Sequence, residues 1–196
     1  FSITVGTFSI PLEDVVRALF GQQGTYYNIV WNIRLPRIMA GIVAGASLAV
    51  AGTVMQCVLR NPLASPYTLG LSQSAAFGAA FAIIFLGAGS TMASTTSSVV
   101  VNNPYTVTLM AFIWAIVGTT LIMLLSAMTR VSPEAMILAG VAIAAIFQAG
   151  ITALQFFADS VQLSTMVYWT FGDLGRVTWE HLMILDAVLA PILMYF

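Results

Sequence analysis

The chain has 196 residues, of which six are basic and seven acidic, so charged residues make up 7% against roughly 25% in an average soluble domain. Hydrophobic residues make up 60%, and a surface with so few charges could not keep a compact soluble particle dispersed. The composition excludes a soluble globular domain. It also excludes a disordered chain and a nucleic-acid-binding protein, because both need charges that this chain lacks.

The N-terminal residues 11–20 are predicted to form a short amphipathic helix. Pro11 suits the first helical position, Gly21 suits the residue after the end, and apolar residues recur between them at helical spacing. Such a short helix cannot cross a membrane, so we expect it to lie at the membrane interface.

The next segments are defined by long stretches without charge. Stretches of 22, 69 and 24 such residues follow Arg37, Arg60 and Glu134. One spanning helix needs about 20 apolar residues, and a polar run at 90–103, expected to be an aqueous loop, interrupts the longest stretch. We therefore predict an all-α polytopic transmembrane helix bundle. Its spans are expected at about 38–58, 66–87, 105–128 and 135–157, with a truncated fifth at 181–196.

Residues 159–180 separate the last two spans and are predicted not to cross the membrane. A short helix is expected at about 161–171, and Thr178 could cap the helix that follows. The last span contains only 16 residues, and the chain begins with Phe1 rather than methionine, so we expect a fragment of a longer protein.

Small residues recur every fourth position in two of the predicted spans. Rows of this kind let helix backbones approach closely, so both rows are expected to pack against neighbouring helices. They are Gly41, Gly45 and Ala49 in the first span, and Gly70, Ser74, Gly78 and Ala82 in the second.

One face of the 135–157 span is polar, because Gln148, Thr152 and Gln155 are spaced to share it. Amides that face lipid are costly, so this face is expected to look into the bundle or into a wet cavity. It would either form hydrogen bonds between helices or line a transport path.

Few residues in the chain could carry chemistry. Cys57 and His181 are the single residues of their types, no residue set has metal-ligand spacing, and no glycine-rich phosphate loop with a lysine is present. We predict no catalytic residue, no metal site and no enzyme activity. A passage-forming membrane subunit is the better class.

Five motifs make the sequence specific. They are Ile-Arg-Leu-Pro-Arg at 33–37, Arg-Asn-Pro-Leu-Ala-Ser-Pro at 60–66, Leu-Gly at 69–70, Leu-Ala-Gly-Val-Ala at 138–142 and Tyr-Trp-Thr-Phe-Gly-Asp-Leu at 168–174. In this order and spacing the chain resembles the membrane permease of ABC importers for iron–siderophores, haem and vitamin B12. The resemblance covers essentially the whole chain.

This resemblance implies a multi-pass permease domain over residues 1–196, in a bacterial or archaeal cell membrane and surrounded by lipid. The chain would hold helices 2–6 of a ten-helix permease, with residues 1–33 outside the cytoplasm. Its partners would be a second permease subunit (in a homodimer or pseudo-dimer), two cytoplasmic ATPase subunits and an extracytoplasmic binding protein. The chain itself would bind no cofactor, because ATP and Mg²⁺ belong to the ATPase. The transported substrate would be a metal chelate, an iron–siderophore first, with haem and vitamin B12 as alternatives.

The resemblance also assigns Arg34 and Arg37 to docking of the binding protein by its glutamates. An outward arginine pair suits this role, since guanidinium groups form charge-assisted hydrogen bonds with carboxylates. Counting positive charges on each side gives the reverse orientation, with Arg17, Arg34, Arg37 and Arg176 inside and Arg60 and Arg130 outside. The alternative role for the pair is contact with lipid headgroups at the membrane edge.

By the same resemblance, two turns form a cytoplasmic gate. One contains Asn61 and Leu63, and the other contains Ser132, Pro133 and Glu134. The vitamin B12 importer carries small hydroxyl residues where Pro133 and Glu134 stand here, so the gate chemistry differs in this chain. The alternative is that both are purely structural turns.

Two other classes remain to be distinguished. A secondary transporter of a small solute would need ionisable residues or interrupted helices near the membrane midplane, and Asp186 is the only candidate. A structural membrane protein would leave Arg34 and Arg37 without a partner.

Overall fold

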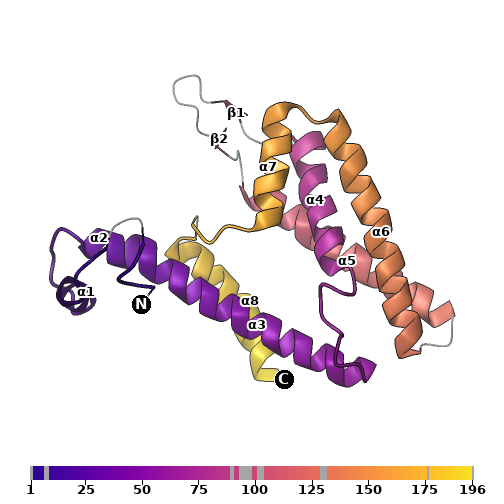
Figure 1. Ribbon diagram of the computed structural model, residues 1–196, viewed down its shortest axis with the longest axis horizontal. Coiled ribbons are helices and arrows are strands. Elements are labelled where there is room, and N and C mark those ends of the chain that lie inside the picture. The colour runs from indigo at the N-terminus through magenta and orange to yellow at the C-terminus, as the bar shows by residue number, and fades with distance from the viewer. Residues whose placement is uncertain are drawn as a thin grey trace. The chain divides into compact units, whose positions relative to one another are not determined.

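The computed structural model describes residues 2–6, 9–88, 91–92, 99–100, 104–128, 132–175 and 177–195. Figure 1 shows that this part of the chain is almost entirely helical, apart from two strands of two residues, β1 (Thr91–Met92) and β2 (Val99–Val100), paired antiparallel. The predicted all-α class is confirmed. The helices are α1 (Leu12–Leu19), α2 (Tyr27–Ile29), η1 (Val30–Arg34), α3 (Leu35–Leu59), α4 (Leu71–Phe85), α5 (Pro104–Met128), α6 (Pro133–Phe157), α7 (Ser160–Phe171) and α8 (Trp179–Tyr195).

Three helical segments of the described chain are long and apolar enough to cross a membrane, namely Tyr27–Leu59, Tyr105–Met128 and Pro133–Phe157. The first joins α2, η1 and α3 into one run of 33 residues. We predicted four complete spans, and the predicted span that is missing from these three contains α4. It has 15 residues, or roughly 22 Å of helix against the roughly 30 Å of a bilayer core.

The helix that contains the predicted span 38–58 begins earlier than that span, at Tyr27. Pro36 lies inside this helix, although proline lacks an N–H and its ring clashes with the carbonyl four residues earlier. In the structure η1, a π-helical turn, comes directly before Leu35 and Pro36 and lets the helix continue through the proline.

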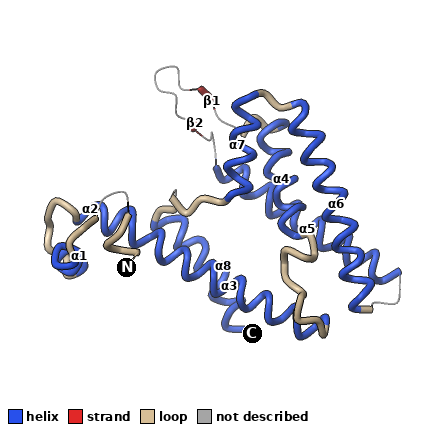
Figure 2. The backbone as a smooth tube through the Cα atoms, viewed as in Figure 1, coloured by secondary structure: helices blue, strands red, loops and turns tan. Residues whose placement is uncertain are grey.

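The span predicted at 66–87 also has a different start. Residues 66–70 form a turn in which the N–H of Leu71 donates to the Pro66 carbonyl at 3.3 Å. Gly70 has a φ of 75°, a left-handed conformation that suits glycine and ends the turn before α4 begins. Figure 2 shows this connection between α3 and α4 as loop.

The chain forms two compact units, Phe1–Val50 with Asp173–Phe196, and Ala51–Gly172. Helix α3 runs through both units, and the single-domain description stays a prediction. In the second unit α4 is central, since it packs against α5, α6 and α7 (Figure 1). Its core combines alanines with a few larger apolar residues and includes Ala79, Ala82, Ile83, Val107, Ala111 and Met166.

The predicted small-residue row of α4 lies in this core. A Cβ added to Gly78 would meet the Met110 carbonyl oxygen and would lie 2.8 Å from the Trp114 Cβ, while one added to Gly118 would lie 2.7 Å from the Ser74 Cβ. Beside them, Phe77 meets Trp114 edge to face with the ring centroids 4.7 Å apart. Helices α4 and α5 are therefore in backbone-level contact.

The first unit has a smaller core formed by Ile10, Val15, Ala18 and Val30, which places α1 against η1. Other apolar residues at this helix are exposed, with Leu12 at 67% and Phe20, which follows the last helical residue, at 82%. Helix α1 is shorter by two residues than the predicted range 11–20. It is amphipathic, as the sequence indicated.

A side chain caps the start of each of the last two helices, and of the two capping residues only Thr178 was predicted. Asp159 caps α7 by accepting from the N–H groups of Val161 and Gln162, both at 2.8 Å. Thr178 precedes α8 and accepts from the N–H of His181 at 3.5 Å. Most of the predicted loop 90–103, together with Arg130 and Arg176 from the topology count, lies outside the described residues.

Candidate docking and gate sites

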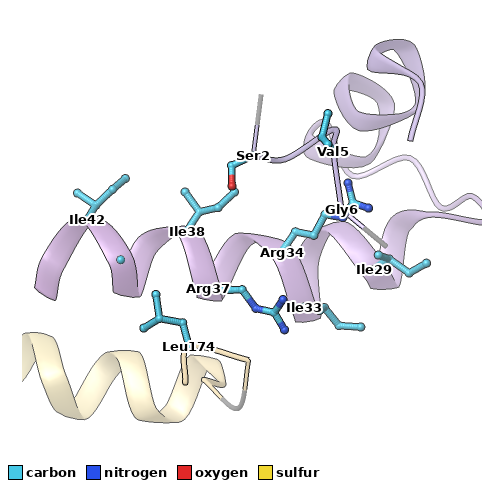
Figure 3. A pocket seen from close by; sticks show the side chains of 11 residues that line it. Ser2, Val5, Gly6, Ile29, Ile33, Arg34, Arg37, Ile38, Ile42 and Leu174 are labelled. Carbon is cyan, nitrogen blue, oxygen red and sulfur yellow. The ribbon is translucent and has the colours of Figure 1, made fainter. Parts of the chain in front are cut away.

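A cavity of about 670 Å³ lies beside the helix that carries Arg34 and Arg37, within the first unit (Figure 3). Its wall consists of Ser2, Val5 and Gly6 of the N-terminal segment, helix residues between Ile29 and Ile42, and Leu174. Apart from the two guanidinium groups the lining is largely apolar. The structure thus brings both predicted docking residues to one cavity.

Arg34 is buried, with 9% of its surface exposed. Its Nη1 donates to the Ile3 carbonyl at 2.6 Å, and a Cβ added to Gly6 would lie 3.2 Å from its Nη2. The guanidinium therefore holds the N-terminal segment against the helix. This geometry gives Arg34 a structural role and leaves little of it for an incoming carboxylate.

Arg37 lies on the other side of the helix, toward Leu174 (Figure 3), and is exposed. Its Nη2 donates to the Gly175 carbonyl at 3.3 Å. A guanidinium has five N–H donors, so most of them remain available to a partner. The Asp173 carboxylate lies on the same loop and accepts from the Gly175 N–H at 2.6 Å, which orders the loop beneath Arg37.

Two tryptophans that the sequence reasoning missed connect this region. The Trp179 Nε1 donates to the Trp31 carbonyl at 2.8 Å, and the Trp31 Nε1 donates to the Ala18 carbonyl at the end of α1 at 2.7 Å. Their ring centroids are 6.2 Å apart. The sequence contains a signal for the contact at Trp31, because Pro36 follows Trp31 by five residues inside an apolar helical pattern.

The first predicted gate turn closes the C-terminal end of α3. The Asn61 N–H donates to the Gln56 carbonyl at 3.2 Å and the Arg60 N–H donates to the Cys57 carbonyl at 3.4 Å, which together form a Schellman motif. Arg60 occupies the left-handed position of that motif with a φ of 47°. The Asn61 side chain then accepts from the Leu63 N–H at 2.9 Å, and the turn presents Leu63 with 80% of its surface exposed.

The second predicted gate turn begins α6. Ser132 is the N-cap residue, and its Oγ accepts from the Ala135 N–H at 3.1 Å. Pro133 occupies the first helical turn, where a missing N–H costs nothing, and Glu134 places a negative charge at the positive end of the helix dipole. The local role of all three residues is therefore helix initiation.

The structure brings these two turns together at one end of the second unit. Leu59, Ala64 and Leu69 form a buried cluster against Met136 and Ile137 of the first turns of α6. A Cβ added to Gly140 would lie 2.9 Å from the Leu69 Cα, so this contact is also at the level of the backbone. Residues that flank the two predicted gate turns therefore pack against each other, although the turns lie about 70 residues apart in the sequence.

The polar face of α6 points away from the packed helices. Gln148 and Thr152 are exposed and Gln155 is half-buried, whereas Ile143, Phe147 and Ile151 on the opposite face are buried. The Thr152 hydroxyl donates to the Gln148 carbonyl of its own helix at 3.0 Å. Within the described chain the two glutamine amides make no hydrogen bond to another helix. This face is therefore available to further helices or to a water-filled path.

No group of three or more His, Cys, Asp or Glu side chains within the described residues lies close enough together to hold a metal ion. The two sites offer an exposed guanidinium, that of Arg37, near the start of α3 and an exposed leucine, Leu63, on the hydrogen-bonded turn that follows its end.

A model of the FecCD transport family matches residues 1–196. The chain belongs to the FecCD transport family. This FecCD protein fits the solved structure of a metal-chelate type ABC transporter in an inward-facing conformation with a TM-score of 0.71 and 27% identity, covering 98% of this chain and 54% of that one. The resemblance read from the motifs is confirmed.

Named relatives agree with this membership. A Methanocaldococcus jannaschii protein described as an ABC transporter permease is 52% identical over 197 residues, covering 100% of this chain and 56% of the relative. The vitamin B12 import system permease protein of Salmonella arizonae is 35% identical over 166 residues, covering 85% and 46%. The hemin transport system permease protein of Yersinia pestis is 34% identical over 165 residues, covering 84% and 47%. The chain spans about half the length of the curated relatives it matches.

Proposed function

We propose that this chain is part of the permease subunit of an ABC importer that moves a metal chelate across a bacterial or archaeal cell membrane. Membership of the FecCD family over the whole chain is the observation that carries this proposal. Two permease subunits, two ATPase subunits and an extracytoplasmic binding protein form the importer. The chain makes and breaks no bonds, and ATP with Mg²⁺ acts on the partner ATPase.

The second unit supplies the parts that such a passage needs. The paired turns at Asn61–Leu63 and Ser132–Glu134 act as the cytoplasmic gate, with Leu63 as the apolar side chain that meets its counterpart from the second permease. Its 80% exposure in the isolated chain leaves it free for that contact. The outward face of α6 with Gln148, Thr152 and Gln155 lines the path, since weakly polar groups let bulky cargo pass without tight binding.

In the first unit the docking role divides unequally between the two arginines. Arg37 is exposed and has free donors, so it receives a carboxylate of the binding protein. Arg34 is buried against the Ile3 carbonyl and fixes the N-terminal segment beside it. The alternative for Arg37 is contact with lipid headgroups at the membrane edge.

The transport class is tested with the full-length permease and its ATPase subunits in proteoliposomes that also receive the loaded binding protein. Uptake is expected to require ATP hydrolysis and to continue when ion gradients are dissipated. Uptake that follows an ion gradient without ATP would replace the proposal by a secondary transporter.

Docking is tested by charge reversal. Arg37→Glu is expected to weaken association with the binding protein by about tenfold or more, since it removes an attraction and adds a repulsion. A Glu→Arg change on the partner should restore part of the loss. Arg17→Glu is the matched control, because Arg17 is an exposed arginine of the same unit that already pairs with Glu13. Equal association of wild type and Arg37→Glu would leave only the headgroup role.

The substrate is tested by titrating the binding protein with ferric siderophores, haem and cobalamin. We expect a ferric siderophore to bind with the highest affinity. Preferential binding of haem or cobalamin would change the substrate and leave the transport class intact.

A further inference from the structure

The carbonyl group of Trp31 has an unusual position in the helix ladder. In η1 the N–H of Leu35 donates to the carbonyl of Val30, five residues earlier. The next carbonyl in this pattern is that of Trp31, and its partner would be residue 36. Residue 36 is a proline with no N–H to donate, so Pro36 removes the main-chain partner of Trp31.

A side chain from a distant part of the sequence replaces that partner. The indole Nε1 of Trp179 donates to the Trp31 carbonyl at 2.8 Å, across a sequence separation of 148 residues. Trp179 is the first residue of α8, and the Thr178–His181 cap fixes its backbone. The indole has a single N–H group, so this hydrogen bond uses the full donor capacity of Trp179.

The same stretch also contacts Arg37, since the Gly175 carbonyl accepts from its guanidinium. Gly175 and Trp179 therefore hold the helix at two points, at Arg37 just after Pro36 and at Trp31 before it. Between these points lies the π turn that ends at Arg34. Any loosening of the Trp179 contact would change the direction in which Arg37 is presented.

We infer that Trp179 is a positioning residue for docking: its indole N–H satisfies the carbonyl that Pro36 leaves without a donor, and this bond holds the π turn that orients Arg37. The inference rests on the proposed docking role of Arg37. The inference gives Pro36 and Trp179 one joint role. Pro36 leaves the Trp31 carbonyl without a main-chain donor, and Trp179 supplies the donor.

A membrane-interface tryptophan that only fills space would behave differently. Indole rings are enriched at the interface for their amphipathic shape, and such a ring would act independently of residue 36. The inference instead predicts that the two positions are coupled. A double-mutant cycle separates the two cases.

The experiment uses the full-length permease with its ATPase subunits in lipid nanodiscs. Trp179→Phe keeps the ring and removes the N–H, and Pro36→Ala restores a main-chain donor at residue 36. In the wild-type background we expect Trp179→Phe to weaken binding-protein association about fivefold, the value of one hydrogen bond. In the Pro36→Ala background the same change should alter association less than twofold. Trp169→Phe in α7 is the matched control, because the Trp169 indole N–H makes no hydrogen bond within the described chain.

Two further readouts do not depend on docking. The ultraviolet resonance Raman difference between wild type and Trp179→Phe should show a hydrogen-bonded indole N–H. The melting temperature should fall with Trp179→Phe only when residue 36 is proline. If these two results hold while Arg37→Glu leaves association unchanged, the docking proposal fails and the Trp179–Pro36 coupling stands. Equal losses from Trp179→Phe in both backgrounds, or a free indole N–H in the wild type, would overturn the inference.

Discussion

Two rows of small residues with the same spacing have different surroundings in this structure. The row that begins at Gly70, just before α4, and continues with Ser74, Gly78 and Ala82 is buried and meets α5 and α6. In α3 the residues Gly45 and Ala49 are exposed, and a Cβ added to Gly45 would meet nothing within 4 Å. The spacing shows where a helix permits close approach, whereas the neighbouring helix decides whether the approach occurs.

The difference matters because relatives are about twice as long as this chain. In the α4 row each gap is already filled by a named neighbour, such as Trp114 beside Gly78 and Ala144 beside Gly70. In the α3 row Gly45 has open space within the described chain, whereas a Cβ added to Gly41 would lie 3.6 Å from the Leu174 Cδ1. We expect the α3 face at Gly45 to receive a further helix of the permease or of its second copy.

The largest effect is expected from leucine at Gly78. A leucine side chain there would collide with the Met110 carbonyl and the Trp114 Cβ, so α4 and α5 would have to separate. We expect the full-length permease to lose about 3 kcal/mol or more of unfolding free energy, or to fail to assemble. Thermal unfolding in detergent and the yield of monodisperse protein measure this loss.

Gly45→Leu is the matched comparison, with the same substitution in the other row. If the α3 row faces lipid, the change costs less than about 0.5 kcal/mol. If a further helix occupies the row, the loss approaches that of Gly78→Leu and depends on the presence of the second permease. A larger loss at Gly45 than at Gly78 would contradict the packing seen around α4.

A second prediction concerns the N-terminal end of the same small-residue row, where Gly70 meets α6. A Cβ on Gly140 would lie 2.9 Å from the Leu69 Cα and 3.2 Å from its carbonyl oxygen, so the backbone itself must shift. Gly140→Ala is expected to cost about 1–2 kcal/mol and to separate the two gate turns. Spin labels on the two turns would report the separation, and Gly52→Ala, at a glycine with open space around it, is the control. An unchanged distance with unchanged stability would contradict the close contact.

The features that could be predicted from the sequence are those that depend on local contacts. Charge-free stretches indicated apolar helices at about 105–128 and 135–157, and the helices found are Pro104–Met128 and Pro133–Phe157. The predicted cap residue Thr178 accepts from the N–H three residues later, and Ser132, predicted only as a gate-turn residue, makes the same local bond. These signals need only neighbouring residues, and so one sequence is enough to read them.

The features that could not be predicted depend on distant partners. The start of the first long helix at Tyr27 could not be predicted, because Trp179, which donates to the Trp31 carbonyl before Pro36, comes from the far end of the chain. Arg34 was expected to face outward because nothing near it in the sequence reveals the Ile3 carbonyl that binds it. The site residues could be listed from motifs, whereas the unequal exposure of Arg34 and Arg37 follows only from the tertiary structure.

The smallest effect on stability is expected at the residue that follows α3. Here the comparison is between two residues with left-handed backbone, one before α4 and one after α3. Gly70 before α4 has a φ of 75° and no room for a Cβ, so glycine is required there on two grounds. Arg60 after α3 has a φ of 47°, a conformation that costs a residue with a Cβ about 1–2 kcal/mol. Arg60→Gly should therefore stabilise the permease, and the greater freedom of glycine in the unfolded chain reduces the gain to about 0.5–1 kcal/mol.

Arg60→Ala separates the backbone from the side chain in this last test. Alanine removes the guanidinium and keeps the Cβ in the left-handed conformation, so its stability should stay within about 0.5 kcal/mol of wild type. If alanine and glycine stabilise equally, the gain comes from losing the charge rather than from relieving the backbone. A loss with both variants would show that the Arg60 side chain itself holds the turn, and the Schellman bonds from Arg60 and Asn61 would then be secondary.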